Sequence, residues 1–592
     1  MEVLCESCYF SYDFLKAPVM PLARCYEFGP FRLDATGGVL FRDSERLAIS
    51  PKAIEVLILL VQAQGNPVTK EELLSKVWPD AIVEEGSLTS HISLLRKTLG
   101  EHYIETIPKR GYRFIGSAKP VTESRQQRPQ IRSLAVLPLS SLGRDEDGDR
   151  FADSMTEALI TNLAKVRALR VVSRTSVLRY KNTQKSMPEI GTELAVDGLV
   201  EGSVQLEGNR VRINARLVSA PNDEHLWADF YDRDLRDVLI LQNEVARAIA
   251  KEIQVTLTPQ ERARLAGGRA VDPEAYQLYV KGRHLWVKRT EETLDRAIRY
   301  FEASIARDPD YAAAYSGLAD CYSSLAFSFD IGSQRPADVQ PKARAAALKA
   351  IALDEGLAEA HNSLAYVMLN YDWDWDGAEA EFMQSLLLNP GYAHAHHWYA
   401  HLLLSSGRTP EALAESYRAV ELDPLSSIMN LHLGWHYLYS QEYDRALDQL
   451  AKTLELDPNY GLAYWYRGLV YEQQGKYDEA LQELSHAKDL LKTNLTLDAD
   501  RARIYAAWGD RSNADRTIAK LSRVSSRRYV NPYQIALIYA GLQQVAEAFD
   551  WLGKALHERS DMLVYLKIDP RLNPLRADPR FVDFERRVGI PN

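Results

Sequence analysis

The chain has 592 residues, of which 46% are hydrophobic and 26% are charged, and its formal net charge is −10. This length is too great for one hydrophobic core, so we expect about four structural units. The acidic balance excludes nucleic-acid or lipid binding driven by overall charge, and any nucleic-acid site must be a local basic patch.

The cysteines and the apolar runs indicate the cellular compartment. Four cysteines are too few to cross-link a chain of this length, which is typical of a reducing environment. No run approaches the roughly 18 apolar residues of a membrane helix, and the first 25 residues lack the features of a secretion signal. We therefore expect a cytoplasmic protein without membrane contact. Residues 1–25 are expected to be a disordered extension or to contain an incorrectly annotated start, with Met20 as the true one.

Short β-like runs and three helical patterns follow one another over residues 26–117. Thr69 with Glu72 is typical of a helix N-cap, and Gly100 ends the third helical pattern. The elements predicted here are strands at 28–33, 38–42, 103–107 and 111–115, and helices at 51–63, 69–77 and 84–99.

The third predicted helix has an apolar face and a small, polar face. Four aliphatic residues recur at helical spacing and should be buried, namely Leu88, Ile92, Leu95 and Leu99. Small polar side chains on the opposite face would let the helix approach base edges in a major groove, and basic side chains could meet phosphates. The predicted DNA-binding residues are Ser87, Thr89, Ser90, Ser93, Arg96, Lys97, Lys109, Arg110 and Arg113.

Motifs in this module resemble the OmpR/PhoB-type winged-helix domain of the CadC/HilA-like regulators. They are Ser50-Pro51-Lys52, Val77-Trp78-Pro79, His91-Ile92-Ser93 and Ile107-Pro108-Lys109-Arg110-Gly111-Tyr112-Arg113-Phe114. The resemblance implies a winged helix-turn-helix fold over residues 26–117 and double-stranded DNA as partner. Winged helices also dock proteins, and basic and acidic residues nearly balance here, so protein docking is the alternative.

Residues 118–131 have the polar, proline-containing composition of a linker. Strands and helices then alternate over residues 132–257, which predicts an α/β domain. The elements predicted in it are strands at 133–139, 169–173, 199–205 and 210–217, and helices at 151–166 and 238–253.

Motifs of this middle domain resemble the α/β domain of TolB N-terminal and FlgO-like proteins. They include Ala135-Val136-Leu137-Pro138, Glu201-Gly202-Ser203 and Trp227-Ala228-Asp229. The resemblance implies an interaction or sensing element. Because the domain has no phosphate-binding glycine loop and no Gly-x-Ser-x-Gly motif, we expect neither enzyme activity nor a cofactor. The turn at residues 173–176 either binds an anion or caps a helix.

Beyond residue 272 the chain repeats itself. Pro390, Pro424 and Pro458 each follow Leu-Asn or Leu-Asp, at intervals of 34 residues. This period is that of the tetratricopeptide (TPR) repeat. We expect about eight helix pairs over residues 272–560, followed by a C-terminal tail at 561–592. The predicted fold class is therefore multidomain: a winged helix-turn-helix (α+β), an α/β middle domain and an all-α TPR solenoid.

The positions that face the concave groove in the TPR frame are histidine, aromatic or apolar. They are Asn362, Tyr366, His394, His397, His401, Leu431, Trp435, Tyr439 and Trp465. We expect them to receive a small ligand or a protein or peptide partner, of which RNA polymerase is one candidate. The alternative is that they pack against neighbouring helices. The three histidines from residue 394 onward could ligate zinc, but we expect no metal site.

These features favour a one-component, cytosolic transcriptional regulator, whose winged helix binds promoter DNA and whose repeats sense a ligand or partner. The alternative is a TPR scaffold whose winged helix docks protein. In a third hypothesis the middle domain is catalytic, but no nucleophile–base or metal-ligand pattern supports it.

Overall fold

The computed structural model describes residues 25–35, 38–42, 45–47, 49–78, 85–121, 131–143, 146–328, 332–492 and 494–591. The chain divides into two compact units, residues 1–129 and 130–592. The expectations for residues 1–24 and for residues 122–130 of the linker lie outside the described residues.

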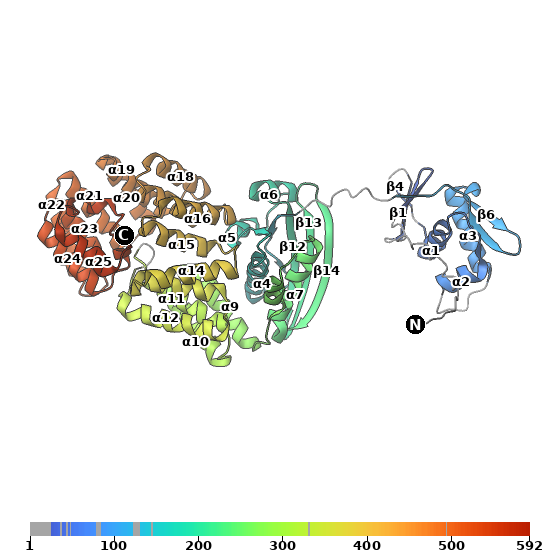
Figure 1. Cartoon of the computed structure of the whole chain (residues 1–592), viewed down its shortest axis with the longest axis horizontal. Coiled ribbons are helices and arrows are strands. Elements are labelled where there is room, and N and C mark those ends of the chain that lie inside the picture. Colours follow the sequence, from blue (N-terminus) through green and yellow to red (C-terminus); the bar gives the residue numbers. More distant parts are fainter. Residues whose placement is uncertain are drawn as a thin grey trace, which may run out of the picture. The chain divides into compact units, whose positions relative to one another are not determined.

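In its described residues the first unit combines three helices with two small antiparallel sheets, ordered β4-β3-β2-β1-β8 and β5-β7-β6 (Figure 1). Its strands are β1 Cys25–Phe28, β2 Phe31–Asp34, β3 Val39–Arg42, β4 Glu45–Arg46, β5 Val68–Thr69, β6 Ile104–Ile107, β7 Gly111–Phe114 and β8 Lys119–Val121. Its helices are α1 Pro51–Gln62, α2 Lys70–Val77, α3 Glu85–Leu99 and the short 3₁₀ turn η1 Glu101–Tyr103.

Two predictions for this unit were wrong. The single strand expected at 28–33 is a hairpin, because Gly29 adopts a positive φ of 55° and lets Phe28 pair with Phe31. Residues 119–121, assigned to the linker, form strand β8 against β1. Pairing with an edge strand, which composition does not reveal, therefore extends the domain beyond residue 117.

Local side-chain contacts explain the helix boundaries and the packing of the helices. The Ser50 and Thr69 side chains cap α1 and α2, and Thr69 Oγ1 accepts from the Glu72 amide at 3.1 Å. Lys52 Nζ donates to the Val77 carbonyl at 2.6 Å, which ties the start of α1 to the end of α2. The predicted buried face of α3 is confirmed for all four aliphatic residues, which are at most 4% exposed.

The second unit begins with a sheet ordered β11-β9-β12-β13-β14, to which β10 adds beside β12. Its strands are β9 Ser133–Val136, β10 Ser140–Ser141, β11 Arg170–Val171, β12 Gly198–Glu207, β13 Arg210–Ser219 and β14 Glu224–Asp234. Its helices are α4 Glu146–Ala164, α5 Arg174–Val177, η2 Leu178–Tyr180, α6 Met187–Leu194, η3 Leu235–Asp237, α7 Val238–Glu252 and α8 Pro259–Ala266.

Helices α4 and α7 lie side by side against this sheet, between it and the first repeats (Figure 1). The strands predicted at 199–205 and 210–217 are confirmed as β12 and β13, which pair as an antiparallel hairpin. Strand β14 was missed because most of its side chains are exposed, Phe230 among them at 61%, so its sequence lacks an apolar alternation.

Within the described residues, α9 to α24 form eight consecutive antiparallel helix pairs. They are α9 Pro273–Trp286 with α10 Glu291–Arg307, α11 Ala312–Ala326 with α12 Pro336–Leu353, α13 Ala358–Val367 with α14 Trp375–Leu388, α15 Ala393–Ser405 with α16 Thr409–Leu422, α17 Ser427–Tyr439 with α18 Tyr443–Leu456, α19 Gly461–Gln473 with α20 Tyr477–Leu491, α21 Leu495–Trp508 with α22 Arg511–Val524, and α23 Pro532–Gly541 with α24 Val545–His557. A π-helical turn, η4 Met368–Asp372, follows α13. A Cβ atom at Gly468 would lie 2.1 Å from Leu484 Cδ1 and 3.0 Å from the Ala480 carbonyl oxygen, so the glycine lets α19 approach α20 closely.

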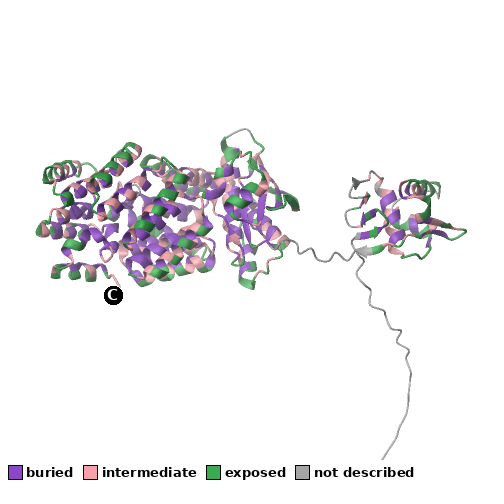
Figure 2. Cartoon of the chain, turned by 90° about the horizontal axis from the view of Figure 1, so that it is seen from above, coloured by how far each residue is buried: buried purple, intermediate pink, exposed green. Residues whose placement is uncertain are grey.

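Residues 561–591, here called the C-terminal segment, correct the expectation of a simple tail. They fold into η5 Asp561–Tyr565, η6 Pro570–Leu575 and α25 Pro579–Val588. Residues 561–566 are buried in the same core as the repeats, and Figure 2 shows the buried interior of this unit in purple. The run Met562-Leu563-Val564-Tyr565-Leu566 is the signal that was overlooked, because five consecutive apolar residues need a core to enter.

None of the helices among the described residues is both long and apolar enough to cross a membrane.

Candidate nucleic-acid interface and interior cavity

Helix α3 presents a polar face to solvent opposite its buried aliphatic face. Thr89, Ser90, Ser93 and Lys97 are exposed, and Ser87 is half-buried. Ser90 Oγ donates to the Gly86 carbonyl at 3.0 Å, one turn earlier, so this side chain lies flat along the helix. A helix that enters a major groove needs a surface of small polar side chains.

Arg96 departs from the phosphate contact predicted for it. Its Nε donates to the Ile104 carbonyl at 3.0 Å, and its Nη2 donates to Thr106 Oγ1 at 2.7 Å. The guanidinium therefore fastens the end of α3 to strand β6. Its role in the structure is to orient α3 relative to the β6–β7 hairpin.

The tip of the β6–β7 hairpin carries two exposed cations, Lys109 and Arg110. The third predicted wing residue, Arg113, lies back on β7, where its guanidinium pairs with the Glu105 carboxylate and its Nε donates at 3.0 Å. Gly111 holds the hairpin against β5, since a Cβ there would lie 2.0 Å from the Val68 carbonyl oxygen. The basic tip of the wing is thus made of Lys109 and Arg110.

In the second unit the C-terminal segment covers much of the predicted groove. Tyr565 packs edge-on against Trp435, with ring centroids 5.1 Å apart. Arg571 Nη2 donates to Tyr439 Oη at 3.0 Å, and its Nη1 donates to Asp500 Oδ1 at 3.0 Å. Asp500 in turn accepts from Trp465 Nε1 at 2.9 Å.

The predicted groove residues therefore fall into two groups. The first group belongs to the core shared with the C-terminal segment and is at most 5% exposed: Leu431, Trp435, Tyr439 and Trp465. The prediction that these residues line a groove open to a peptide is therefore wrong. The residues that line cavities instead are Asn362, Tyr366, His394 and His397. His401 is buried beside Tyr565, and His432, which the sequence analysis did not select, lies next to it.

A cavity of about 480 Å³ lies between the α/β domain and the repeats. Helices α4, α5, α9, α15 and α17 all contribute side chains to it. Its walls include four arginines, three acidic groups and a set of rings: Arg174, Arg179, Arg283, Arg289, Glu157, Asp423, Asp457, Trp286, Tyr392, His394, His397, Trp398, His432 and Tyr466.

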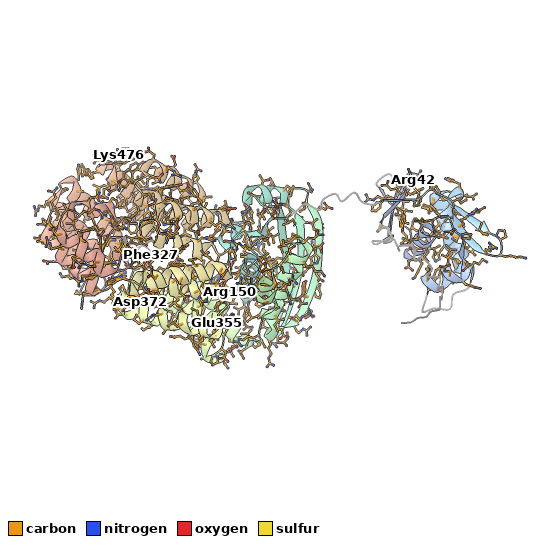
Figure 3. All side chains as sticks on the ribbon, in the orientation of Figure 1. Arg42, Arg150, Phe327, Glu355, Asp372 and Lys476 are labelled. Carbon is orange, nitrogen blue, oxygen red and sulfur yellow. The ribbon has the colours of Figure 1, made fainter. Side chains whose placement is uncertain are left out.

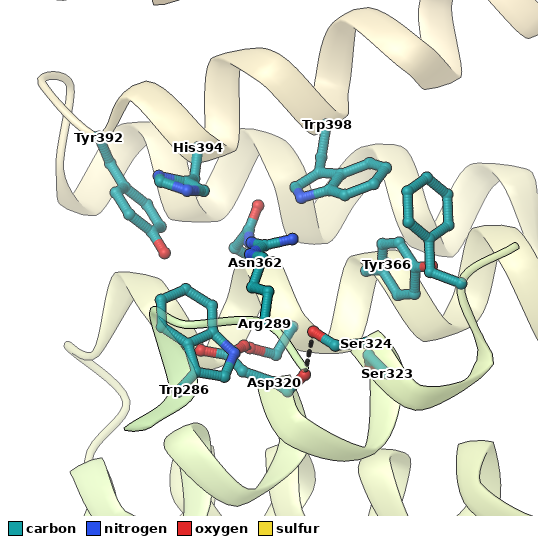
Figure 4. Close-up of a pocket in the computed structure, with 12 residues that line it drawn as sticks. Trp286, Arg289, Asp320, Ser323, Ser324, Asn362, Tyr366, Tyr392, His394 and Trp398 are labelled. Carbon is teal, nitrogen blue, oxygen red and sulfur yellow. Dashed lines mark hydrogen bonds between the residues drawn. The ribbon is translucent and has the colours of Figure 1, made fainter. Parts of the chain in front are cut away.

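A smaller cavity of about 50 Å³ adjoins it and shares several of these walls. Figure 4 shows His394 and Trp398 projecting from α15 toward Asn362 and Arg289. Phe327, whose position in the repeats is labelled in Figure 3, closes one side by packing edge-on against Trp398 at 5.2 Å between ring centroids.

Neighbouring charges on the cavity wall shift one another's pKa values. Burial alone would raise the pKa of Glu157, but the Arg283 and Arg174 guanidiniums outweigh it and hold this pKa at about 2. Arg283 Nη2 lies 2.6 Å from Glu157 Oε1. Burial, with Arg289 and Arg283 nearby, lowers the pKa of His394 to about 4, so its ring is neutral at pH 7.

The turn at residues 173–176 binds an anion that belongs to the protein itself. The Ser176 amide and Oγ donate to Asp423 Oδ1 at 2.9 and 2.6 Å, and Ser176 Oγ accepts from the Leu425 amide at 2.8 Å. Asp423 precedes one of the repeat prolines. The repeat motif therefore also provides one of the contacts that attach the α/β domain to the repeats.

Comparison with known proteins agrees with the two sequence resemblances at the ends of the chain. The family model described as "Transcriptional regulatory protein, C terminal" matches residues 44–114. The model described as "Tetratricopeptide repeat" matches residues 289–324, 374–427 and 431–492.

Relatives match different shares of the chain. Transcriptional regulator HilA of Salmonella typhimurium is 26% identical over 436 residues, which cover 73% of this chain and 76% of HilA. A putative adenylate cyclase of Rhizobium meliloti is 38% identical over 193 residues, and the match spans only 33% of that protein. The solved DNA-binding domain of Escherichia coli CadC is 28% identical; its match covers 17% of this chain and 98% of that domain, with a TM-score of 0.16. The chain is therefore a transcription regulator in which an OmpR/PhoB-type DNA-binding domain precedes TPR repeats.

Proposed function

We propose that the protein is a one-component regulator that places α3 in the major groove of promoter DNA. The observation that carries this proposal is the two-sided build of α3. Its face of Leu88, Ile92, Leu95 and Leu99 is buried, and its opposite face is exposed and mostly small and polar, with Leu94 as an apolar member that is 39% exposed. Ser87, Thr89, Ser90 and Ser93 would meet base edges, and Lys97 would meet a phosphate. Lys109 and Arg110 at the wing tip would hold the adjacent backbone or minor groove.

The signal would enter the second unit through its interior cavity. A volume of about 480 Å³ lies within the range of small-molecule sites, about 300–1,000 Å³, and rings alternate with charged groups on its walls. A small ligand is therefore favoured over a peptide for this position. A protein partner such as RNA polymerase would bind the outer helices, where exposed apolar side chains include Leu348 on α12 and Met383 on α14.

The protein would act by binding and not by catalysis, and it would do so in the cytoplasm, where promoter DNA is found. Charged groups around the cavity form ion pairs with one another, as the Arg283–Glu157 pair illustrates. This arrangement supports a recognition site. The similarity of residues 132–257 to TolB-type domains stays a prediction.

Selection of bound DNA from a random library by the full chain, at two salt concentrations, tests the DNA-binding mode. We expect an enriched motif that survives the higher salt. The double variant Lys109→Ala/Arg110→Ala should bind more weakly, with a logarithmic salt slope reduced by about 2, since each phosphate contact contributes about 0.9.

A matched control removes the same charge elsewhere in the first unit. Arg32 and Lys119 are exposed on the sheet of β1, β2 and β8, so Arg32→Ala/Lys119→Ala should leave affinity and salt slope close to those of the wild type. Binding that is motif-free and lost at the higher salt would instead support the scaffold hypothesis, in which the winged helix docks protein.

A further inference from the structure

Two histidine pairs with four-residue spacing face each other inside the repeats. His397 and His401 lie on α15, and His432 and His436 lie on α17. This spacing places both rings of a pair on the same face of a helix, the arrangement by which helices offer two imidazoles to a zinc ion. The second pair could not be linked to the first from the sequence, because helix packing, and not sequence proximity, brings the two pairs together.

Three of the rings are close enough to share an ion. One ring nitrogen from each of His397, His401 and His432 lies within 4.8 Å of the other two. His401 Nε2 and His432 Nδ1 are 2.9 Å apart. Tetrahedral coordination with bonds of ~2.1 Å places ligand nitrogens about 3.4 Å apart, so small side-chain rotations suffice to reach it.

The three rings are buried inside the repeats. His397, His401 and His432 are at most 6% exposed. Imidazole nitrogen is among the usual ligands of zinc in proteins, and buried imidazoles that face one another form a pre-arranged donor set.

Hydrogen bonds orient two of the rings. His401 Nδ1 lies 3.2 Å from Tyr565 Oη, which leaves His401 Nε2 facing the cluster. Beside His401, Ser416 Oγ donates to the Ala412 carbonyl and so accepts from His436 Nδ1 at 2.5 Å. The lone pair of His436 is then on Nε2, a buried atom for which the described part of the chain provides no hydrogen-bond partner.

We propose that His397, His401 and His432 bind one transition-metal dication of the zinc type. Three imidazoles leave a tetrahedral position open. His397 and His432 also line the 480 Å³ cavity, which gives the ion a path of entry and lets water or a small ligand complete its coordination. The bound ion would join α15 to α17 and, through Tyr565, to the C-terminal segment.

Cobalt titration of the full chain, purified in the presence of a chelator, tests this site. We expect one Co²⁺ per chain, with the visible ligand-field absorption of tetrahedral nitrogen coordination, and its loss when Zn²⁺ is added. A thiolate-to-cobalt charge-transfer band would place the ion on cysteines and would overturn the proposal, as would the absence of stoichiometric binding.

Single variants assign the ligands. His401→Gln and His432→Gln should each weaken Co²⁺ binding by more than about 100-fold, since even outer hydrogen-bond partners account for about 10–100-fold. Tyr565→Phe should weaken it about 10-fold while the ligand-field spectrum stays tetrahedral. Unchanged affinity in His401→Gln and His432→Gln would refute the site.

His396→Gln is the matched control, because this histidine lies on the same helix but is engaged with Glu415 at 2.5 Å and with the Pro390 carbonyl at 3.0 Å. It should bind Co²⁺ like the wild type. If circular dichroism shows that His401→Gln is unfolded, His397→Gln at the cavity wall provides the same test. None of these readouts depends on DNA binding, so they distinguish failure of this site from failure of the regulatory role.

Discussion

Helix α3 and the inner helices of the repeats each pack one face against their neighbours, but they differ in what lies against the opposite face. In α3 the face left over after packing stays in solvent, and Ser93 and Lys97 are exposed. In α17 the face left over after packing is covered by the chain's own C-terminal segment, and Trp435 is 1% exposed. Hydrophobic periodicity therefore predicts which face of a helix packs against its neighbours. It does not predict whether the opposite face stays in solvent or is covered by a distant segment of the chain.

The largest expected effect comes from uncovering the inner face of the repeats. Arg571 is buried, and its Nη2 lies 2.8 Å from Asp569 Oδ2 and its Nη1 lies 3.0 Å from Asp500 Oδ1. Arg571→Ala leaves two carboxylates buried without their cation, so we expect the free energy of unfolding to fall by about 3–5 kcal/mol. Urea denaturation followed by tryptophan fluorescence measures it.

Arg580→Ala is the control for that prediction. Arg580 pairs with Asp578 in the same segment, but its side chain is 51% exposed. Because solvent screens an exposed ion pair, this variant should unfold nearly as the wild type does. Equal losses in both variants would show that Arg571 does not anchor the segment.

The second largest effect is a loss of stability of the second unit at acidic pH. The native pKa of His394 is lowered to about 4, whereas an unfolded histidine has a pKa of about 6.5. Below pH 6.5 the unfolded chain binds a proton that the native chain does not, so stability falls by about 1.4 kcal/mol per pH unit until about pH 4. From pH 7 to pH 5 the wild type should lose about 2 kcal/mol more than His394→Gln.

Nearby groups that titrate in the opposite sense do not confuse that comparison. Burial raises the pKa values of Asp320 and Asp423 to about 6, so these two stabilise the native chain as the pH falls. They are present in both proteins and cancel in the difference. Chemical denaturation at the two pH values gives the result, and equal pH dependence in both proteins would contradict the lowered pKa of His394.

A smaller effect is expected in the first unit, where one face of α3 stays in solvent. Because Arg96 binds the Ile104 carbonyl and Thr106, Arg96→Ala should lower the melting temperature of the first unit, at a cost of about 1–2 kcal/mol. The base preference of the folded variant should stay unchanged. An altered preferred motif in the library selection would show that Arg96 contacts DNA and would contradict its purely structural role.

The smallest effect separates a phosphate contact from a structural one. Lys97→Ala should leave thermal stability unchanged and reduce the logarithmic salt slope of DNA binding by about 1. Lys119→Ala, on β8, should change neither. A salt slope that stays constant in Lys97→Ala would place this side chain away from the backbone.

Much of the fold could be predicted from the sequence where its signals are local. The N-cap at Thr69, the hairpin of β12 and β13 and the buried face of α3 each depend on residues within one or two turns of one another. The rest depended on distant partners. Arg96 meets Ile104 only once a helix lies on a strand, and Tyr565 meets His401 across 164 residues of chain.

The late position of the C-terminal segment has a consequence for biosynthesis. Ser328 binds the Asp561 carboxylate at 2.6 and 2.9 Å across 233 residues, so the repeats leave the ribosome well before the residues that fill them. At roughly 5–20 residues per second, the last 30 or so residues take a few seconds to translate. During that interval the nascent repeats hold an aromatic inner surface without its cover, and such transiently exposed apolar surface favours aggregation.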